Sequence, residues 1–108
     1  MAPEQARGDR EVGAGVDIYG LGATLLTLLN GAPPFSGNPP AVVLRRVLEE
    51  EPDWPRERDR PVGRELKAIC LKCLEKDPAR RFRSAGELAE VLRRYLDDEP
   101  TGVVLPGP

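Results

Sequence analysis

The sequence predicts an all-α fold of four helices joined by long loops rich in proline and glycine. Apolar residues recur at helical spacing in four segments, and proline or glycine stands at the ends of most of them. No segment shows the two-residue alternation of a half-buried strand. The 12 prolines and 11 glycines place much of the chain in turns and loops. A chain of 108 residues has room for one domain.

The first helix is predicted over residues 16–30, after fifteen residues whose glycines and charges show no period and predict a loop. Its apolar side chains occupy nearly every face, and Gly31 followed by two prolines ends it. A helix that is apolar all round is normally buried all round. This short chain has few segments to cover it, so we expect one flank to stay bare.

The second helix is predicted from the proline pair at 39–40, with Asn38 as its cap, to about Glu51. Pro52 ends it, and residues 52–62 then form a surface loop in which Trp54 is the large apolar anchor. The apolar stripe of this helix consists of Val43, Leu44, Val47 and Leu48.

The third helix is predicted over residues 63–76, and the Asp77–Pro78 pair marks its end. A short turn then leads to the last helix, over residues 84–97, where Ser84 and Glu87 have the spacing of a capping box. The apolar stripes of the two helices are Leu66, Ile69, Cys70, Cys73 and Leu74, and then Leu88, Val91, Leu92, Tyr95 and Leu96.

Composition excludes several functional classes. The chain has no histidine, which removes histidine-dependent triads, histidine phosphotransfer and most zinc sites. A net charge of −2 and the lack of a basic recognition helix argue against a nucleic-acid partner, including a small DNA-binding bundle. The longest apolar run, residues 23–29, is far too short to span a membrane, and the N-terminus lacks a signal pattern. We therefore expect a cytoplasmic protein.

Cys70 and Cys73 form a C-x-x-C pair on the third predicted helix. A zinc site would need two further ligands from a chain that has no other cysteine and no histidine. The two thiols are therefore interpreted as reduced, small apolar core residues, and no metal ligand is assigned.

Three strings become informative together: APE at residues 2–4, DIYGLG at 17–22 and CLEKDPARR at 73–81. In order and spacing they resemble the second half of the C-terminal lobe of a bacterial-type serine/threonine protein kinase, from the APE motif to the last helix. The string NGAPPF is similar to the TGxPPF of the same family. The resemblance implies a partial kinase domain over residues 1–97 and a flexible tail over residues 98–108.

The resemblance implies structural roles for four residues. In the family, the glutamate of APE and the arginine of DPxxR form a buried ion pair, which corresponds here to Glu4 and Arg81. The aspartate at Asp17 is buried in the family and accepts hydrogen bonds from the catalytic loop, and Gly22 permits close packing. On their residue types alone, Glu4 and Arg81 could equally be solvated, and Asp17 could simply cap its helix.

The motifs of kinase chemistry are missing from the sequence. It has no glycine-rich phosphate loop, no strand lysine, no catalytic-loop aspartate and no magnesium-binding aspartate and asparagine. No catalytic, cofactor-binding or metal-binding residue is assigned, and ATP, Mg²⁺ and a protein substrate are implied for the complete kinase only. We expect an inactive fragment, produced by a truncated gene or an internal start at Met1. The alternative is an independent helical docking module derived from a kinase lobe.

Overall fold

The computed structural model describes residues 2–8, 13–31, 35, 39–51 and 64–103. Within these ranges the regular secondary structure is all helical, with no strand, which confirms the predicted all-α class. A 3₁₀-helix, η1, accompanies five α-helices. In chain order the elements are α1 (Pro3–Ala6), α2 (Ala14–Asn30), α3 (Pro40–Glu49), α4 (Arg64–Cys73), η1 (Pro78–Arg80) and α5 (Ala85–Leu96).

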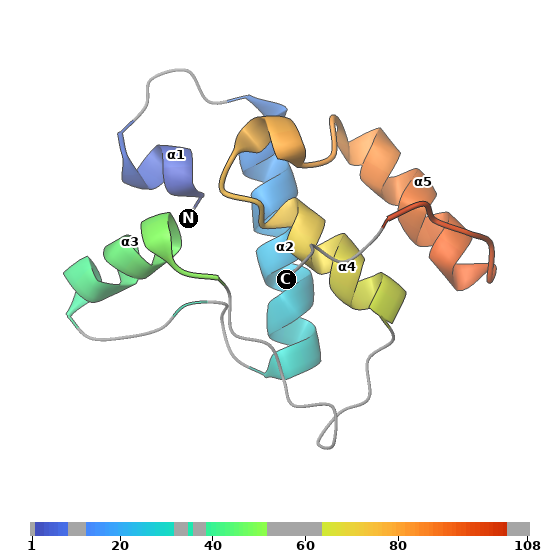
Figure 1. The fold of residues 1–108 in the computed structure, drawn as a ribbon, viewed down its shortest axis with the longest axis horizontal. Helices are drawn as coiled ribbons and strands as arrows, with labels where there is room; N and C mark the ends of the chain where they lie inside the picture. Colours follow the sequence, from blue (N-terminus) through green and yellow to red (C-terminus); the bar gives the residue numbers. More distant parts are fainter. Residues whose placement is uncertain (1, 9–12, 32–34, 36–38, 52–63, 104–108) are drawn as a thin grey trace.

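The long helix α2 is the centre of the arrangement. Helices α4 and α5 pack against it on one side, and the short helix α1 and helix α3 lie together on the other (Figure 1). None of the helices in the described part of the chain is long and apolar enough to cross a membrane.

The side chains of α2 contribute to two buried clusters. Ile18 belongs to a cluster formed mainly with α4 and α5, whereas Tyr19 and Leu26 belong to one formed with the N-terminal segment and the end of α4. The first cluster consists of Ile18, Ile69, Cys73, Phe82, Leu88 and Val91, and the second of Ala2, Tyr19, Leu26 and Leu74. Because α2 serves both clusters, burial of its apolar residues joins the two sides of the fold.

The helix α1 lies in a segment for which the sequence predicted only a loop. Pro3 occupies its first position, where the missing N–H costs no hydrogen bond and the fixed φ favours a helix. The Gln5 side chain accepts a hydrogen bond from the Ala2 N–H at 2.9 Å and so closes this single turn. Four residues are too few to show a helical period, so the prediction was wrong here for a physical reason.

The four predicted helices are all present, with shifted ends. Helix α2 begins two residues before the predicted start, and α3 ends at Glu49 rather than near Glu51. Helix α4 ends at Cys73 rather than residue 76, because the N–H of Glu75 bonds to the third rather than the fourth preceding carbonyl and the last turn tightens. The predicted cap at Asn38 and the loop with Trp54 lie outside the described residues.

Helix α5 begins at the predicted capping motif. The Ser84 hydroxyl accepts a hydrogen bond from the Glu87 N–H at 3.0 Å. The Glu87 carboxylate reaches back one residue further than in the usual box, to the Arg83 N–H at 3.1 Å. Beyond α5, Thr101 is buried and Val103 packs against the first cluster, while residues 104–108 lie outside the described ranges. A flexible tail over 98–108 therefore stays a prediction.

One flank of α2 is bare. Leu21 is 50% exposed and Leu28 is 71% exposed, although both belong to the most apolar helix of the chain. A groove of about 290 Å³ runs between this flank and α5, with Leu25 and Leu92 among its lining residues. The sequence predicted that this helix would lack partners, and the exposed leucines confirm it.

Candidate functional site

The guanidinium of Arg81, which follows η1, forms hydrogen bonds with four other described residues. Asp77 caps this short helix, since its carboxylate accepts a hydrogen bond from the Ala79 N–H at 3.0 Å. Pro78 starts the turn with a preset φ, and the backbone then becomes extended at Arg81. The sequence Asp77-Pro78 thus builds the turn after which the Arg81 side chain is fully buried.

Arg81 and Glu4 form a two-pronged ion pair across 77 positions of sequence. The Nη1 group donates to Glu4 Oε2 at 2.7 Å, and the Nη2 group donates to Glu4 Oε1 at 2.8 Å. The two side chains are 0% and 5% exposed. Parallel hydrogen bonds between a guanidinium and a carboxylate are among the strongest polar contacts in proteins. The pair therefore joins α1 to the turn before α5.

The remaining donors of Arg81 bind backbone carbonyls. Nε donates to the Glu75 oxygen at 2.7 Å, Nη1 to the Gly15 oxygen at 3.0 Å and Nη2 to the Lys76 oxygen at 3.4 Å. Two of these carbonyls follow the end of α4, where helical backbone partners run out. One buried cation thus fixes α1, the start of α2 and the end of α4 relative to one another. We call Arg81, Glu4 and these three carbonyls the arginine hub.

An aromatic ring completes the surroundings of the hub. The Arg81 guanidinium carbon lies 5.0 Å from the centre of the Tyr19 ring, within range of a cation–π interaction. Burial raises the pKa of the Tyr19 hydroxyl to about 12, with the positive charge of Arg81 acting in the opposite sense. Tyr19 therefore stays a neutral aromatic surface on which the guanidinium rests.

The charge state of Glu4 is set mainly by its partner. The hydrogen bond from Arg81 holds the pKa of the Glu4 carboxyl below its usual value of 4.5, against the opposing effect of burial. Glu4 is accordingly ionised at neutral pH, which the buried guanidinium requires.

Gly22 of α2 packs directly against Cys73 of α4. A Cβ atom at this position would overlap the Cβ of Cys73. The two helices can approach to this distance only with a bare backbone at position 22. By contrast, a Cβ on Gly20, on the same helix, would meet no atom within 4 Å.

Asp17 is separate from the arginine hub. It lies in the first turn of α2 and its side chain is exposed, with no hydrogen bond to another described residue. It lines an open pocket of about 500 Å³ together with Ala2, Gln5 and Tyr19. The structure therefore brings Glu4 and Arg81 together, puts Gly22 at a helix contact and leaves the Asp17 carboxylate facing solvent.

Side chains that could ligate a metal are scattered over the described residues. Nowhere among them do three or more histidine, cysteine, aspartate or glutamate side chains gather as a metal would require. Cys70 and Cys73 are buried free thiols, and burial raises the pKa of each to about 12. Thiols that stay protonated are poor ligands and poor nucleophiles.

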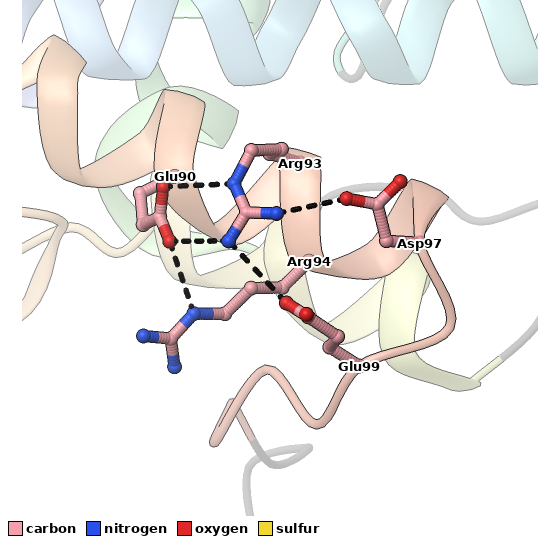
Figure 2. Close-up of polar contacts among 5 residues, drawn as sticks. All are labelled: Glu90, Arg93, Arg94, Asp97 and Glu99. Atoms are coloured by element: carbon pink, nitrogen blue, oxygen red, sulfur yellow. Dashed lines mark hydrogen bonds and ion pairs between the residues drawn. The ribbon is translucent and has the colours of Figure 1, made fainter.

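Two polar features were not anticipated from the sequence. The backbone carbonyls of the hub leave no signal, because any residue type supplies one. A second, exposed network surrounds Arg93 on α5, which bonds Glu90, Asp97 and Glu99, while Arg94 also bonds Glu90 (Figure 2). Opposite charges at three- and four-residue spacing along a helix could have predicted most of it.

Comparison with known proteins places this geometry in a family. The family model of the protein kinase domain matches residues 1–93. The chain belongs to the protein kinase domain family. Glu4 and Arg81, which the hub joins, stand at the two family motifs APE and DPxxR.

The relatives are much longer than the chain. It is 40% identical over 100 residues to the serine/threonine-protein kinase PknB of Mycobacterium tuberculosis, covering 93% of the chain and 16% of that protein. It is 38% identical over 102 residues to the tyrosine-protein kinase MasK of Myxococcus xanthus, covering 94% and 16%. The chain thus spans about a sixth of the length of these curated relatives.

A solved structure shows the same arrangement. The chain superimposes on the twitchin kinase region of C. elegans with a TM-score of 0.74 and 26% sequence identity. The match covers 99% of the chain and 17% of that protein chain. The helical architecture is therefore that of part of a kinase domain, which agrees with the fold class expected from the sequence.

Proposed function

We propose that this chain is the helical base of a serine/threonine protein kinase and transfers no phosphate by itself. The parent reaction is transfer of the γ-phosphoryl group of ATP to a serine or threonine hydroxyl of a protein substrate. The observation that carries the proposal is the arginine hub, which ties the APE segment to the DPxxR turn in a fold similar to a kinase. The identity to PknB supports serine and threonine as acceptors.

In this proposal, the four residues singled out in the sequence hold the base together or receive the rest of the domain. Glu4 and Arg81 fix α1, and Gly22 sets the spacing of α2 and α4. The exposed Asp17 carboxylate is the acceptor for backbone N–H groups of a catalytic loop that this sequence does not contain. Residues 1–97 form this base, residues 98–108 are its tail, and a cytoplasmic location remains a prediction.

A chimera tests the proposal directly. Residues 1–97 of this chain replace the matching segment of the M. tuberculosis kinase, and transfer from radiolabelled ATP to peptides with serine, threonine or tyrosine is measured. We expect phosphorylation of serine or threonine by the chimera and none by the 108-residue chain. Transfer by the isolated chain, or a folded chimera without activity, would contradict the proposal.

An independent docking module is the second candidate. One observation favours it: in the described part of the chain, no buried side-chain nitrogen or oxygen lacks a hydrogen-bond partner. Stable folds satisfy the hydrogen bonds of their buried polar groups, and the described part of this chain does so as well. A cooperative thermal transition in a monomeric sample supports the module. Broad melting with dye binding and aggregation supports the fragment, because the bare flank of α2 then associates.

A further inference from the structure

Helix α3 stands apart from the rest of the molecule. It lies beside α1 and away from the packed group of α2, α4 and α5 (Figure 1). Of its ten residues, only Val47 is buried. One buried valine contributes about 1.5–3 kcal/mol, which is little to hold a helix in place. Contacts with the neighbouring α1 and with residues outside the helix therefore help to set the position of α3.

Lys76, just beyond α4, makes such a contact. Its Nζ group donates a hydrogen bond to the backbone oxygen of Val47 at 2.6 Å, across 29 positions of sequence. Val47 lies in the last turn of α3, where carbonyls have no partner within the helix. The N–H of Glu50 satisfies the neighbouring Arg46 oxygen, so Lys76 supplies what the helix itself does not. A cation at this end also complements the helix dipole.

The same lysine also contacts the segment that precedes α3. Its Nζ atom lies 5.0 Å from the centre of the Phe35 ring, and the Arg46 guanidinium carbon lies 5.7 Å from that centre. Phe35 is buried. Cations near the face of a buried aromatic ring are attracted by its quadrupole. Lys76 therefore contacts α3 in two ways. It binds the last turn directly, and it contacts the Phe35 ring, which Arg46 of α3 also contacts.

We propose that Lys76 is a latch that docks α3 on the rest of the fold, and that α3 is released as a unit when the latch is removed. The predicted consequence is local: α3 opens while α2, α4 and α5 keep their packing. This inference concerns the folded chain only and is independent of whether the parent kinase is active.

Hydrogen exchange followed by mass spectrometry tests the latch on the full 108-residue chain. Lys76→Met keeps the length and apolar stem of the side chain but removes its donor and charge. We expect the amides of α3 to exchange on the order of tenfold faster, the effect of losing one charge-assisted hydrogen bond, with unchanged rates in α2 and α5. Lys76→Arg, which keeps both charge and donors, should bring the α3 rates back toward those of the parent.

The matched control is Lys72→Met. Lys72 lies one turn earlier, with its Nζ 4.9 Å from the centre of the Phe82 ring, so this variant removes a similar cation–π contact away from α3. It should leave the α3 rates unchanged. Four outcomes would overturn the latch: α3 rates in Lys76→Met that match the parent, equal acceleration in every helix, no rescue by arginine, or α3 amides that are unprotected in the parent itself.

Discussion

The Glu4–Arg81 pair and the network around Arg93 join the same kinds of side chain in opposite surroundings. The first pair is buried and connects positions 77 residues apart. In the second, all the side chains are about half exposed and lie within ten residues of one another (Figure 2). The distances are nearly equal, 2.7 Å and 2.8 Å for the closest contacts.

The comparison shows that contact distance alone does not measure what an ion pair contributes. Water screens the exposed network and can replace each of its bonds, so its loss changes little. In the hub, loss of one partner leaves an uncompensated charge in the interior. Only the hub also fixes segments that are distant in sequence, and it is therefore where we expect the fold to depend on charge.

The largest effect is expected from Arg81→Met. The substitution keeps an apolar stem but leaves the Glu4 carboxylate buried alone, so the free energy of unfolding should fall by about 3–5 kcal/mol. Urea unfolding followed by circular dichroism measures this. The control is Arg80→Met at the exposed neighbouring position, which should unfold like the parent. Similar losses of unfolding free energy in the two variants would show that the buried arginine stabilises the fold no more than the exposed one.

Gly22→Ala tests how much the close packing of α2 on α4 contributes to stability, without changing any charge. The added methyl group overlaps Cys73, and overpacking of this kind costs about 1–3 kcal/mol of unfolding free energy. Gly20→Ala is the matched control on the same helix. Its Cβ meets no atom, and alanine favours a helix over glycine by up to about 1 kcal/mol, so this variant should be more stable than the parent. Equal shifts in melting temperature for both would contradict the close approach of α2 and α4.

Acid should weaken the hub, because protonation of Glu4 removes the negative partner of Arg81. The folded state holds the pKa of Glu4 below 4.5, so the folded chain binds this proton more weakly than the unfolded chain. The resulting stability is complete above pH 4.5 and is lost as the pH falls through the lowered pKa. The loss of stability as the pH falls below 4.5 should therefore be larger in the parent than in Glu4→Gln, which urea unfolding at a series of pH values measures.

The matched control for acid is Glu90→Gln. Hydrogen bonds from Arg93 and Arg94 lower the pKa of Glu90 to about 2, but its exposure lets water and salt screen the interaction. This variant should keep the acid dependence of the parent. Loss of that acid dependence in Glu90→Gln would show that the exposed network, and not the hub, makes stability depend on pH.

The smallest effect is expected from Arg93→Ala, although this substitution removes three ion pairs on the surface of α5. Its melting temperature should differ from that of the parent by little more than the scatter of repeated melts, and the difference should shrink in high salt. A loss comparable to that of Arg81→Met would show that the surface network carries the fold.

The sequence was sufficient to predict the four long helices and the two charged residues of the arginine hub. The apolar stripes predicted four helices because their period extends over several turns, and the resemblance paired Glu4 with Arg81. The structure adds α1, which is too short to have a period. It also shows that Asp17 is exposed, where the resemblance implied a buried carboxylate.

Contacts through the backbone were out of reach of the sequence. The oxygens of Gly15 and Glu75 bind Arg81, and the oxygen of Val47 binds Lys76, yet a carbonyl gives no residue-type signal. Phe35 and Lys76 are 41 positions apart, so only the folded chain shows that they meet. The apolar faces and the caps of helices can be predicted because they depend on residues close together in the sequence. The arginine hub and the Lys76 latch join residues that are far apart in the sequence, so they depend on tertiary structure.

The close contact between Gly22 and Cys73 makes the Cys73 thiol a reporter of the separation of α2 from α4. The Cys73 thiol is buried and its pKa is raised to about 12, so an alkylating reagent finds neither access nor a thiolate while α2 and α4 stay together. When the reagent labels the open state faster than that state recloses, the labelling rate equals the rate at which this interface opens. Labelling of Cys73, distinguished from that of the buried Cys70 by peptide mapping, can thus report the lifetime of the packed state without a probe attached to the protein.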